Sequence, residues 1–255
     1  MTTSPTVKPQ ISEMPLREHL VELRTRVIRS MAAILITSSI CIFISDKLLA
    51  ILTAPIRQSF GELQIIGTGP ADAFIVGLQV AVLAGFLLAL PFLFFQLWRF
   101  IEPGLVENEK RMAIPFVFFS TVFYSSGVLF CYYIMLPFAF GYFYEQFVSY
   151  EMSAQIKIDE YLSFVVKMVL VFGFVFELPI VSYFLARVGI LTHTWLIKQA
   201  RLSVVIIFVV AAVLTPPDVV SQICLAAPLL VIYAMSIGIA YHFNRKREKP
   251  ESSSV

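Results

Sequence analysis

The sequence places one carboxylate, Glu177, in the middle of a stretch that is otherwise almost entirely apolar, "KMVLVFGFVFELPIVSYFLA". A carboxylate inside a lipid-embedded helix costs about 3 kcal/mol on insertion scales, so such a residue marks a functional polar site that faces protein or water. A structural ion pair is the alternative, but Lys167 lies ten residues earlier, about 15 Å along a helix and too far for a bridge within it. Pro179 leaves the carbonyl of Val175 without its helical donor and predicts a kink beside the acid. A neutral Glu177 is then expected to donate a hydrogen bond to freed backbone or to water, which makes an intramembrane polar site.

A second group of carboxylates lies in a short segment between two apolar runs, "PFLFFQLWRFIEPGLVENEKRMAIP". Glu102, Glu107 and Glu109 crowd this segment, and a carboxylate binds a guanidinium best, through two parallel hydrogen bonds. The pattern therefore indicates a site for a cationic ligand that carries arginine. A solvated loop whose acids are neutralised by Lys110 and Arg111 is the alternative. The segment begins with aromatic residues typical of a membrane interface: Phe92, Phe94, Phe95, Trp98 and Phe100.

The elements that position these residues are membrane-spanning helices. Hydrophobic residues make up 58% of the 255-residue chain and charged residues only 14%, whereas charged residues make up about 25% of a soluble domain. The apolar runs show neither the ten-residue alternation of a membrane barrel nor the period of a repeat protein. The sequence predicts an all-α membrane protein with six transmembrane helices at Val27–Ser45, Phe74–Trp98, Met112–Leu136, Leu162–Leu185, Leu202–Leu214 and Val219–Tyr241.

The fifth run, Leu202–Leu214, is short for a span. Its 13 residues cover only about 20 Å as a helix, against about 30 Å of hydrocarbon. We still expect it to span, because Arg201 and Asp218 bound it and "TPPD" leads directly into the sixth run. The short fifth and sixth spans are thus expected to form a hairpin, beside which the bilayer thins or a partner helix covers the mismatch.

Lysine and arginine mark the expected cytoplasmic side of the membrane. Most of the 19 basic residues lie before the first run, between the second and third, between the fourth and fifth, and after the sixth, whereas the other connections hold only Lys47, Arg57 and Lys157. Both termini are therefore expected in the cytoplasm. We expect three parts: a flexible tail at 1–13, a six-span membrane domain at 14–243, and a basic and polar tail at 244–255 that lies near anionic lipid headgroups.

The sequence contains no motif typical of a metal site or of a common class of enzyme. Cys41, Cys131 and Cys224 stand singly inside apolar runs, and the three histidines form no cluster with acidic residues, so no spacing suggests a metal site. No Gly-rich phosphate loop, nucleophile elbow or zincin motif occurs, and we expect no enzyme and no cofactor. The formal net charge of +2 does not suggest a nucleic-acid partner. Uphill transport would draw on a partner or on the proton gradient.

Four stretches of the chain together resemble TatC, the large multi-spanning subunit of the twin-arginine protein translocase. They are "MPLREHLVELRTRVIRS", "QLWRFIEPGLVENEKR", "YLSFVVKMVLVFGFVFELPIV" and "LTPPDVVSQICLAAPLLVIYAMSIGIA". The resemblance runs from about Met14 to Phe243 and implies a subunit of the bacterial cytoplasmic (inner) membrane. That subunit would receive folded proteins with twin-arginine signal peptides and support their export by the proton-motive force. The implied partners are single-span subunits of the TatA and TatB type, further copies of the chain within the receptor complex, and membrane lipids.

The resemblance also implies roles for particular residues. Phe100 and Glu109 match positions of the family's signal-peptide recognition patch, and Glu22 and Arg24 in "HLVELR" match its N-terminal part. In the family's cupped, concave bundle, Glu177 would turn inward toward water.

Three further matches concern the later spans and a helix after the first. Asp218 and Gln222 match polar positions of the hairpin and partner contacts, and Pro55 matches a proline that follows the first span. One departure is Val106, where relatives more often carry an aromatic residue, so contacts to the signal there are expected to differ. No role is assigned to Glu107.

Two other function classes compete with this interpretation. A proton-coupled secondary transporter or channel would also place a carboxylate within the membrane, but the paired Gly-interrupted helices of two matching halves are not visible. A membrane scaffold with no ligand site would explain the spans but not the acidic segment around Glu109. Binding of a twin-arginine peptide, and its loss when the two arginines become lysines, distinguishes these classes.

Overall fold

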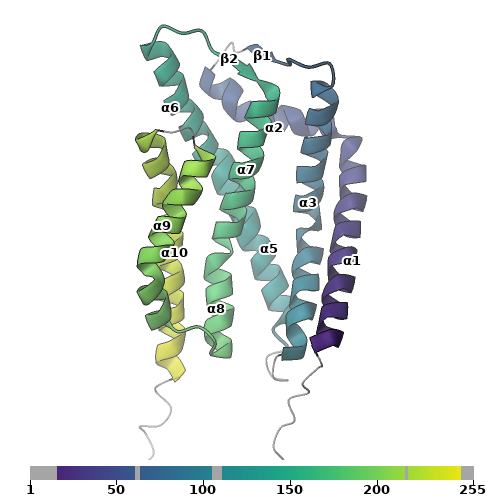
Figure 1. The fold of residues 1–255 in the computed structure, drawn as a ribbon, viewed down its shortest axis with the longest axis vertical. Coiled ribbons are helices and arrows are strands. Elements are labelled where there is room, and N and C mark those ends of the chain that lie inside the picture. The colour runs from purple at the N-terminus through teal and green to yellow at the C-terminus, as the bar shows by residue number, and fades with distance from the viewer. Residues whose placement is uncertain (1–15, 61–63, 105–110, 216–217, 248–255) are drawn as a thin grey trace, which may run out of the picture.

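The computed structural model describes residues 16–60, 64–104, 111–215 and 218–247 of the chain (Figure 1). Within these ranges, six helical segments are long and apolar enough to cross a membrane: Arg17–Ile42, Asp72–Gly104, Ala113–Ser149, Ile158–Val188, His193–Leu214 and Val219–His242. Each contains one of the six apolar runs or most of it. The prediction of an all-α membrane protein with six spans is therefore confirmed.

The elements follow one another as in Figure 1. The helices are α1 (Leu16–Ile42), α2 (Ser45–Phe60), α3 (Asp72–Ile101), α5 (Ala113–Phe130), α6 (Leu136–Ser149), α7 (Ile158–Phe176), α8 (Leu178–Val188), α9 (His193–Leu214) and α10 (Val219–Arg247). Two short helical turns, η1 (Glu102–Gly104) and η2 (Cys131–Met135), extend α3 and join α5 to α6. Two strands, β1 (Gln64–Ile66) and β2 (Gln155–Lys157), pair in parallel. This strand pair and α2 lie at one end of the bundle, whereas α1 begins and α10 ends at the other (Figure 1).

Two of the spans are built from paired helices. In the third, the π-helical turn η2 joins α5 to α6, and Pro137 at the start of α6 offers no N–H to the preceding turn,. In the fourth, α7 ends at Phe176, Glu177 lies between the helices, and α8 begins at Leu178 with Pro179 in its first turn. The helix is thus interrupted beside Pro179, where the sequence predicts a kink.

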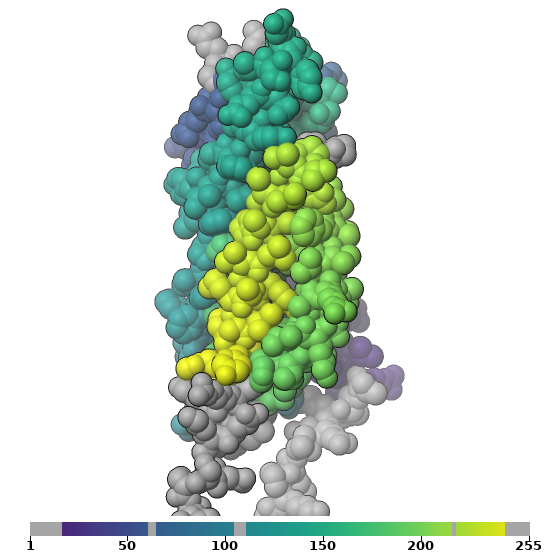
Figure 2. Space-filling model, turned by 90° about the vertical axis from the view of Figure 1, so that its left-hand side faces the viewer, coloured from purple at the N-terminus to yellow at the C-terminus, as the bar shows by residue number. Residues whose placement is uncertain are grey.

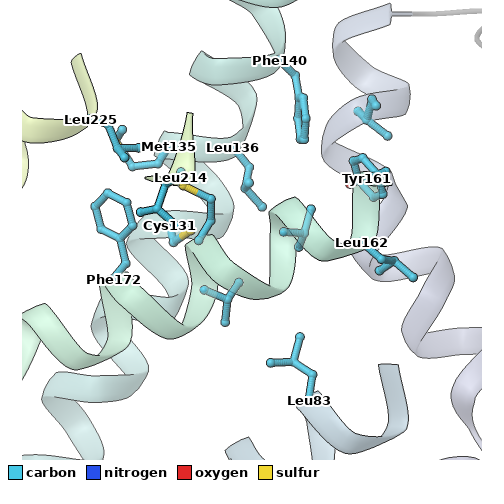
Figure 3. Close-up of a cluster of buried hydrophobic side chains, with 14 of the residues drawn as sticks. Leu83, Cys131, Met135, Leu136, Phe140, Tyr161, Leu162, Phe172, Leu214 and Leu225 are labelled. Carbon is cyan, nitrogen blue, oxygen red and sulfur yellow. The ribbon is translucent and has the colours of Figure 1, made fainter. Parts of the chain in front are cut away.

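The main core surrounds α7. Its buried side chains pack against residues of α2, α3, α6, the η2 turn and the helices α9 and α10 (Figure 3). Because lipid tails are as apolar as these side chains, close van der Waals packing rather than exclusion of water holds the helices together. The α7 residues in this core are Tyr161, Leu162, Val165, Met168, Val169 and Phe172.

Two edges of the bundle have little cover from other helices. The hairpin of α9 and α10 lies along one edge, with α6 rising beyond it (Figure 2), and α1 lies along the other (Figure 1). In the most apolar stretch of α1 only 11% of the residues are buried, and in that of α9 17%, against 39% in the spans that contain α3 and α7. These two edges therefore present the most apolar surface to lipid or to partner helices.

The fifth span is longer than its apolar run predicts. Helix α9 begins at His193 rather than at Leu202 and has 22 residues, which is about 33 Å at the α-helical rise. The polar and apolar residues before the run, "HTWLIKQAR", continue the helix because helix formation does not require every side chain to be apolar. The estimate of about 20 Å was therefore wrong for the helix. The fifth and sixth spans, at 22 and 24 residues, are nevertheless the two shortest of the six described.

Candidate functional site

Helices α1 and α3 run antiparallel and pack closely along their length (Figure 1). The contact is tight at Gly85, where an added Cβ would lie 2.5 Å from the backbone nitrogen and Cα of Ser38. Thr37 donates its hydroxyl to the carbonyl oxygen of Gly85 at 2.7 Å. The approach of the two backbones positions the end of α3 beside the start of α1, where Glu22 and Phe100 lie.

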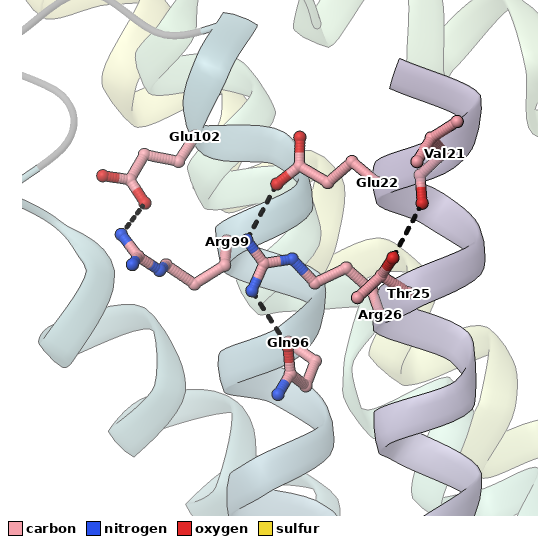
Figure 4. Close-up of polar contacts among 7 residues, drawn as sticks. All are labelled: Val21, Glu22, Thr25, Arg26, Gln96, Arg99 and Glu102. Atoms are coloured by element: carbon pink, nitrogen blue, oxygen red, sulfur yellow. Dashed lines mark hydrogen bonds and ion pairs between the residues drawn. The ribbon is translucent and has the colours of Figure 1, made fainter. Parts of the chain in front are cut away.

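Glu22 takes part in a polar contact across this helix pair. Arg26 donates through Nη2 to Oε1 of Glu22 at 2.8 Å and through Nη1 to Oε1 of Gln96 on α3 at 3.1 Å (Figure 4). The side chains of Arg26 and Glu22 are 18% and 22% exposed, so water screens this pair less than a surface ion pair. Glu22 therefore orients Arg26, and Arg26 ties α1 to α3.

Phe100 lies at the same end of the α1 and α3 pair. Its ring stacks on the imidazole of His19, with the ring centroids 4.3 Å apart and the planes 19° apart. One residue earlier, Arg99 bonds Glu102 at 3.0 Å (Figure 4) and lies 6.0 Å from the ring centroid of Phe95. The surface made by Glu22, Phe100 and their neighbours thus combines carboxylates with aromatic faces, and we call it the α1–α3 surface.

The other predicted residues of the patch are placed differently. Arg24 is exposed on α1, about 200° around the helix from Glu22, so the two residues do not share a face. Glu109 lies outside the described residues, as do Val106 and Glu107. The structure therefore brings Glu22 and Phe100 to one surface, with Arg24 on the far side of α1.

Glu177 is buried, with 7% of its surface exposed. It faces α5, where Ser120 and Tyr124 are its neighbours. The Oε1 atom of Glu177, the Ser120 hydroxyl and the Tyr124 hydroxyl are buried and have no hydrogen-bond partner among the described residues. The expectation that Glu177 faces an open, water-filled concavity is therefore wrong for this conformation, because helix packing encloses the acid.

Aromatic side chains cover the Tyr124 side of this cluster. The Tyr124 ring lies 6.2 Å from that of Phe86 on α3 and 5.4 Å from that of Phe174 on α7. Gly173 admits the tyrosine, since a Cβ there would lie 2.3 Å from its ring. Sequence reasoning missed Ser120 and Tyr124, although their spacing of four residues within an apolar run puts both polar groups on one helix face.

Asp218 and Gln222 organise the hairpin of α9 and α10. Asp218 precedes α10 and accepts the backbone N–H of Ser221 at 2.8 Å, the Ser221 hydroxyl, and the Tyr142 hydroxyl of α6 at 3.4 Å. Burial raises the pKa of Asp218, but these hydrogen bonds outweigh it and hold the pKa below its usual value,. Gln222 donates to the carbonyl oxygen of Phe208 on α9 at 2.9 Å. Both side chains thus serve contacts within the chain.

Pro55 lies inside α2 and is buried. Because proline has no N–H, it leaves the carbonyl four residues earlier, that of Ile51, without its helical donor. The hydroxyl of Tyr132 donates to this oxygen at 2.8 Å, and the hydroxyl of Tyr161 donates to the neighbouring carbonyl of Leu52 at 2.5 Å. Pro55 therefore frees the Ile51 acceptor, and the two tyrosine hydroxyls fix α2 to η2 and α7.

The described residues contain no group of three histidine, cysteine, aspartate or glutamate side chains that could hold a metal ion. The polar groups at the α1–α3 surface are carboxylates, guanidinium groups and an amide beside aromatic rings. Such an arrangement suits binding of a cationic or amphipathic segment rather than the making or breaking of covalent bonds.

Comparison with known proteins gives one consistent result for this fold. The family model for the Sec-independent protein translocase protein (TatC) matches residues 18–228. The TatC protein of Desulforapulum autotrophicum is 42% identical over 242 residues, which cover 94% of this chain and 89% of the relative. That of Aquifex aeolicus is 38% identical over 240 residues, covering 92% of this chain and 98% of the relative.

Two solved structures share the arrangement of helices described above. A crystal structure of the twin-arginine translocase receptor TatC superposes with a TM-score of 0.82 at 37% identity and covers 89% of this chain and 100% of its own. A second crystal structure of TatC, in the detergent DDM, superposes with a TM-score of 0.81, also at 37% identity, and covers 87% of this chain and 99% of its own.

Proposed function

The chain belongs to the TatC family of Sec-independent protein translocase proteins, and we propose that its α1–α3 surface receives the twin-arginine signal peptides of folded cargo proteins. As a TatC protein it is a subunit of the twin-arginine translocase, a transport protein rather than an enzyme, and a multi-pass protein of the inner membrane. The proposal adds the ligand, the side of the membrane and the residues that bind.

The α1–α3 surface would face the cytoplasm. It lies at the end of the bundle where α1 begins and α10 ends (Figure 1), and basic residues at the helix ends there, such as Arg17, Arg99 and Arg187, fit the positive-inside tendency. A signal peptide that has not yet been exported reaches this side first. The opposite end, with α2 and the strand pair, would face the periplasm.

The observation that carries the proposal is that Glu22, bonded to Arg26, and Phe100, stacked on His19, lie at the same end of the neighbouring helices α1 and α3. Guanidinium groups bind carboxylates through paired, charge-assisted hydrogen bonds and also stack on aromatic faces. Glu22 is already paired with Arg26 at 2.8 Å, so it would shape the surface by holding Arg26 in place. Glu109, in the adjacent segment of the sequence, would bind an arginine of the peptide directly.

Peptide binding to the purified protein tests the proposal. We expect Glu109→Gln and Phe100→Ala to weaken binding of a twin-arginine peptide at least tenfold, because a shielded charge-assisted hydrogen bond contributes about 1.5–3 kcal/mol. Glu145→Gln, an exposed acid on α6 near the opposite end, is the matched control and should bind like the wild type. A peptide with two lysines should bind more weakly. If Glu109→Gln and Phe100→Ala both bind with wild-type affinity, the surface is not the receptor site.

The exposed edge formed by α9 would take a single-span partner of the TatA or TatB type. Four apolar side chains of α9 spaced three or four residues apart are more than half exposed: Leu202, Val205, Val209 and Val213. Such a stripe offers one face to a second helix in the membrane. A photo-crosslinker at Val209 should capture such a partner, and one at Leu129 of α5, equally exposed on another face, should not. Equal capture at both positions contradicts this assignment.

Export of folded proteins would be driven by the proton-motive force. The sequence contains no nucleotide-binding loop,, and the intramembrane acid Glu177 is a group whose protonation could respond to that force. Dissipating the proton gradient in vesicles that contain the assembled translocase should stop export while peptide binding at the α1–α3 surface continues. Export that persists without a gradient contradicts this part of the proposal.

A further inference from the structure

A cleft with one polar end and one apolar end runs along α7. It is separate from the α1–α3 surface around Glu22 and Phe100. Two adjoining cavities make up this cleft, and both are lined by Ser163 and Lys167. One cavity, of about 660 Å³, lies between α7 and the helices α1 and α3. The other, of about 270 Å³, lies toward the end of α7 that carries Asp159 and Glu160. We call the whole the α7 cleft.

The larger cavity is lined almost entirely by apolar side chains. Residues of α3 and α7 such as Val82, Phe86, Leu170 and Phe174 form its walls. Gln79 is an exception: its Oε1 atom is buried and has no hydrogen-bond partner among the described residues. Hydrocarbon fits these walls, whereas a soluble anion would not fill them.

The smaller cavity brings opposite charges together. Lys167 is exposed on α7, and no ion pair with it occurs among the described residues. Of the two acids, Glu160 is engaged by Lys157 at 3.4 Å. The Oδ1 atom of Asp159 is buried and lacks a hydrogen-bond partner within the described parts of the chain. Lys167 and Asp159 therefore present one uncompensated positive and one uncompensated negative charge to the same cavity.

The depth of Lys167 suits a lipid headgroup. The span that contains α7 and α8 has 31 residues, about 46 Å of helix for about 30 Å of hydrocarbon, so about 8 Å would extend beyond each boundary. Lys167 lies nine residues into α7, about 13 Å from its start and hence about 5 Å inside the boundary. A lysine at this depth extends its ammonium group toward the interface, and helical side chains lean toward the N-terminus, where Asp159 lies.

We propose that the α7 cleft binds a zwitterionic phospholipid with a primary ammonium group, of the phosphatidylethanolamine class, from the leaflet on the strand-pair side. Lys167 and Ser163 donate hydrogen bonds to the phosphate, and Asp159 accepts from the ammonium group. One acyl chain follows Leu170 and Phe174 along the larger cavity. The net charge of Lys167 and Asp159 together is zero, which matches a zwitterion better than an anionic lipid.

Lipid titration of the purified, delipidated full-length protein, followed by native mass spectrometry, tests this site. We expect phosphatidylethanolamine to bind about tenfold more tightly than phosphatidylglycerol. Lys167→Gln should weaken binding of both lipids about tenfold through loss of a charge-assisted hydrogen bond. Asp159→Asn should weaken only phosphatidylethanolamine. Lys47→Gln, an exposed lysine on α2 at the same end of the bundle, is the matched control and should bind both lipids like the wild type.

Lys167→Arg separates charge from folding, since it keeps the cation and should retain phosphatidylethanolamine binding. Size-exclusion chromatography of each variant checks that the fold is intact. Wild-type lipid binding by Lys167→Gln would overturn the proposal, and equal binding of the two lipids by the wild type would overturn the zwitterion assignment. If an apolar helix rather than lipid fills the cleft, bound lipid will be absent from the wild type as well. The readout involves no signal peptide, so it stands or fails independently of the proposed function.

Discussion

The hydroxyl of Tyr132 donates to the carbonyl oxygen of Ile51 at 2.8 Å. This carbonyl is the one that Pro55, four residues later in α2, leaves without a helical donor. Tyr132 lies in the π-helical turn η2, so an irregular turn in one helix supplies the donor that an irregular position in another has lost. Two local departures from helical bonding thus form one tertiary contact, and they fix α2 over the end of the bundle.

Replacing Tyr132 with phenylalanine should release this contact. Tyr132→Phe removes one hydrogen bond and leaves a backbone acceptor unpaired, so we expect it to lower the free energy of unfolding by about 1 kcal/mol. Thermal unfolding in detergent measures the change. Tyr133→Phe, at the adjacent residue whose side chain is 69% exposed, is the control and should unfold like the wild type. If Tyr132→Phe is as stable as Tyr133→Phe, the hydrogen bond to Ile51 contributes nothing to the free energy of unfolding.

The contact between Arg26 and Gln96 should also have a measurable energy. Arg26→Met leaves the partly buried carboxylate of Glu22 without its cation and Gln96 without a donor, so we expect a loss of about 2 kcal/mol in the free energy of unfolding. Arg24→Met, two residues earlier and exposed, should change stability by less than about 0.5 kcal/mol.

A double-mutant cycle isolates that contact. Gln96→Leu alone and together with Arg26→Met should show a coupling of about 0.5–1 kcal/mol, since the two side chains share a hydrogen bond. Strictly additive losses would contradict a direct role of Gln96 in holding α1 against α3.

Much of the fold followed from local patterns in the sequence. Apolar runs predict spans because each helix satisfies its own backbone hydrogen bonds, and Pro179 marks the break between α7 and α8 because proline lacks a donor. The start of α9 at His193 was not predicted, since hydropathy reports which residues prefer lipid and not where a helix ends.

The candidate site was less accessible to sequence reasoning than the fold. The lone carboxylate in an apolar run singled out Glu177, and the resemblance to TatC singled out Glu22 and Phe100, but their partners lie far away in the chain. Gln96 is 70 residues from Arg26, and Tyr124 reaches the neighbourhood of Glu177 only because α5 packs against α7 at Gly173. Such pairings depend on helix packing, which no short-range spacing encodes.

Acid should weaken the hairpin of α9 and α10 through Asp218. Its hydrogen bonds hold the pKa in the folded protein below the usual value, so the ionised form contributes stability above about pH 4, the value of an unfolded aspartate. This contribution is lost as the pH falls through the lower folded pKa. Asp218→Asn should therefore be less stable than the wild type at pH 7, and the difference should shrink below about pH 4.

Unfolding measured across this pH range tests the assignment to Asp218. Glu145→Gln, on α6 and exposed, controls for general effects of acid and should run parallel to the wild type throughout. A difference in stability between Asp218→Asn and the wild type that stays constant from pH 7 to about pH 3 would contradict this assignment. The hydrogen bonds of Asp218 at the start of α10 would then not depend on the charge of its carboxylate.

Gly85 should tolerate no larger residue. A Cβ there would lie 2.3 Å from the Ser38 hydroxyl and 2.5 Å from backbone atoms of α1, so Gly85→Ala must push α1 away from α3. We expect a loss of about 1–3 kcal/mol in the free energy of unfolding from overpacking. Gly141→Ala, at a helical glycine with no atom within 4 Å of an added Cβ, should keep or raise stability, because alanine favours helix by about 1 kcal/mol. A stable Gly85→Ala variant would contradict the close approach of the two helices.

Glu177 is expected to act through its hydrogen bonding inside the bundle, and three substitutions separate the possibilities. Glu177→Gln keeps the size and the polar oxygen but cannot ionise, whereas Glu177→Leu removes both properties. Tyr124→Phe removes a neighbouring hydroxyl and leaves the acid in place. A buried polar group without a partner is costly, so we expect a partner helix or signal peptide to bind the acid after the aromatic cover opens. Export should then fall most in Glu177→Leu, which has no polar group to bind.

Export assays in cells with matched amounts of membrane protein provide the measurement, and binding of a twin-arginine peptide to the α1–α3 surface should be kept in all three variants. Wild-type export by Glu177→Gln together with loss in Glu177→Leu would assign the role to hydrogen bonding, and loss in both would assign it to protonation. Full export by Glu177→Leu would leave the acid a structural residue. Tyr124→Phe should export at least as well as the wild type, since it removes a buried hydroxyl that has no hydrogen-bond partner among the described residues. A severe export defect at normal abundance would instead give the tyrosine hydroxyl a direct part in opening the site.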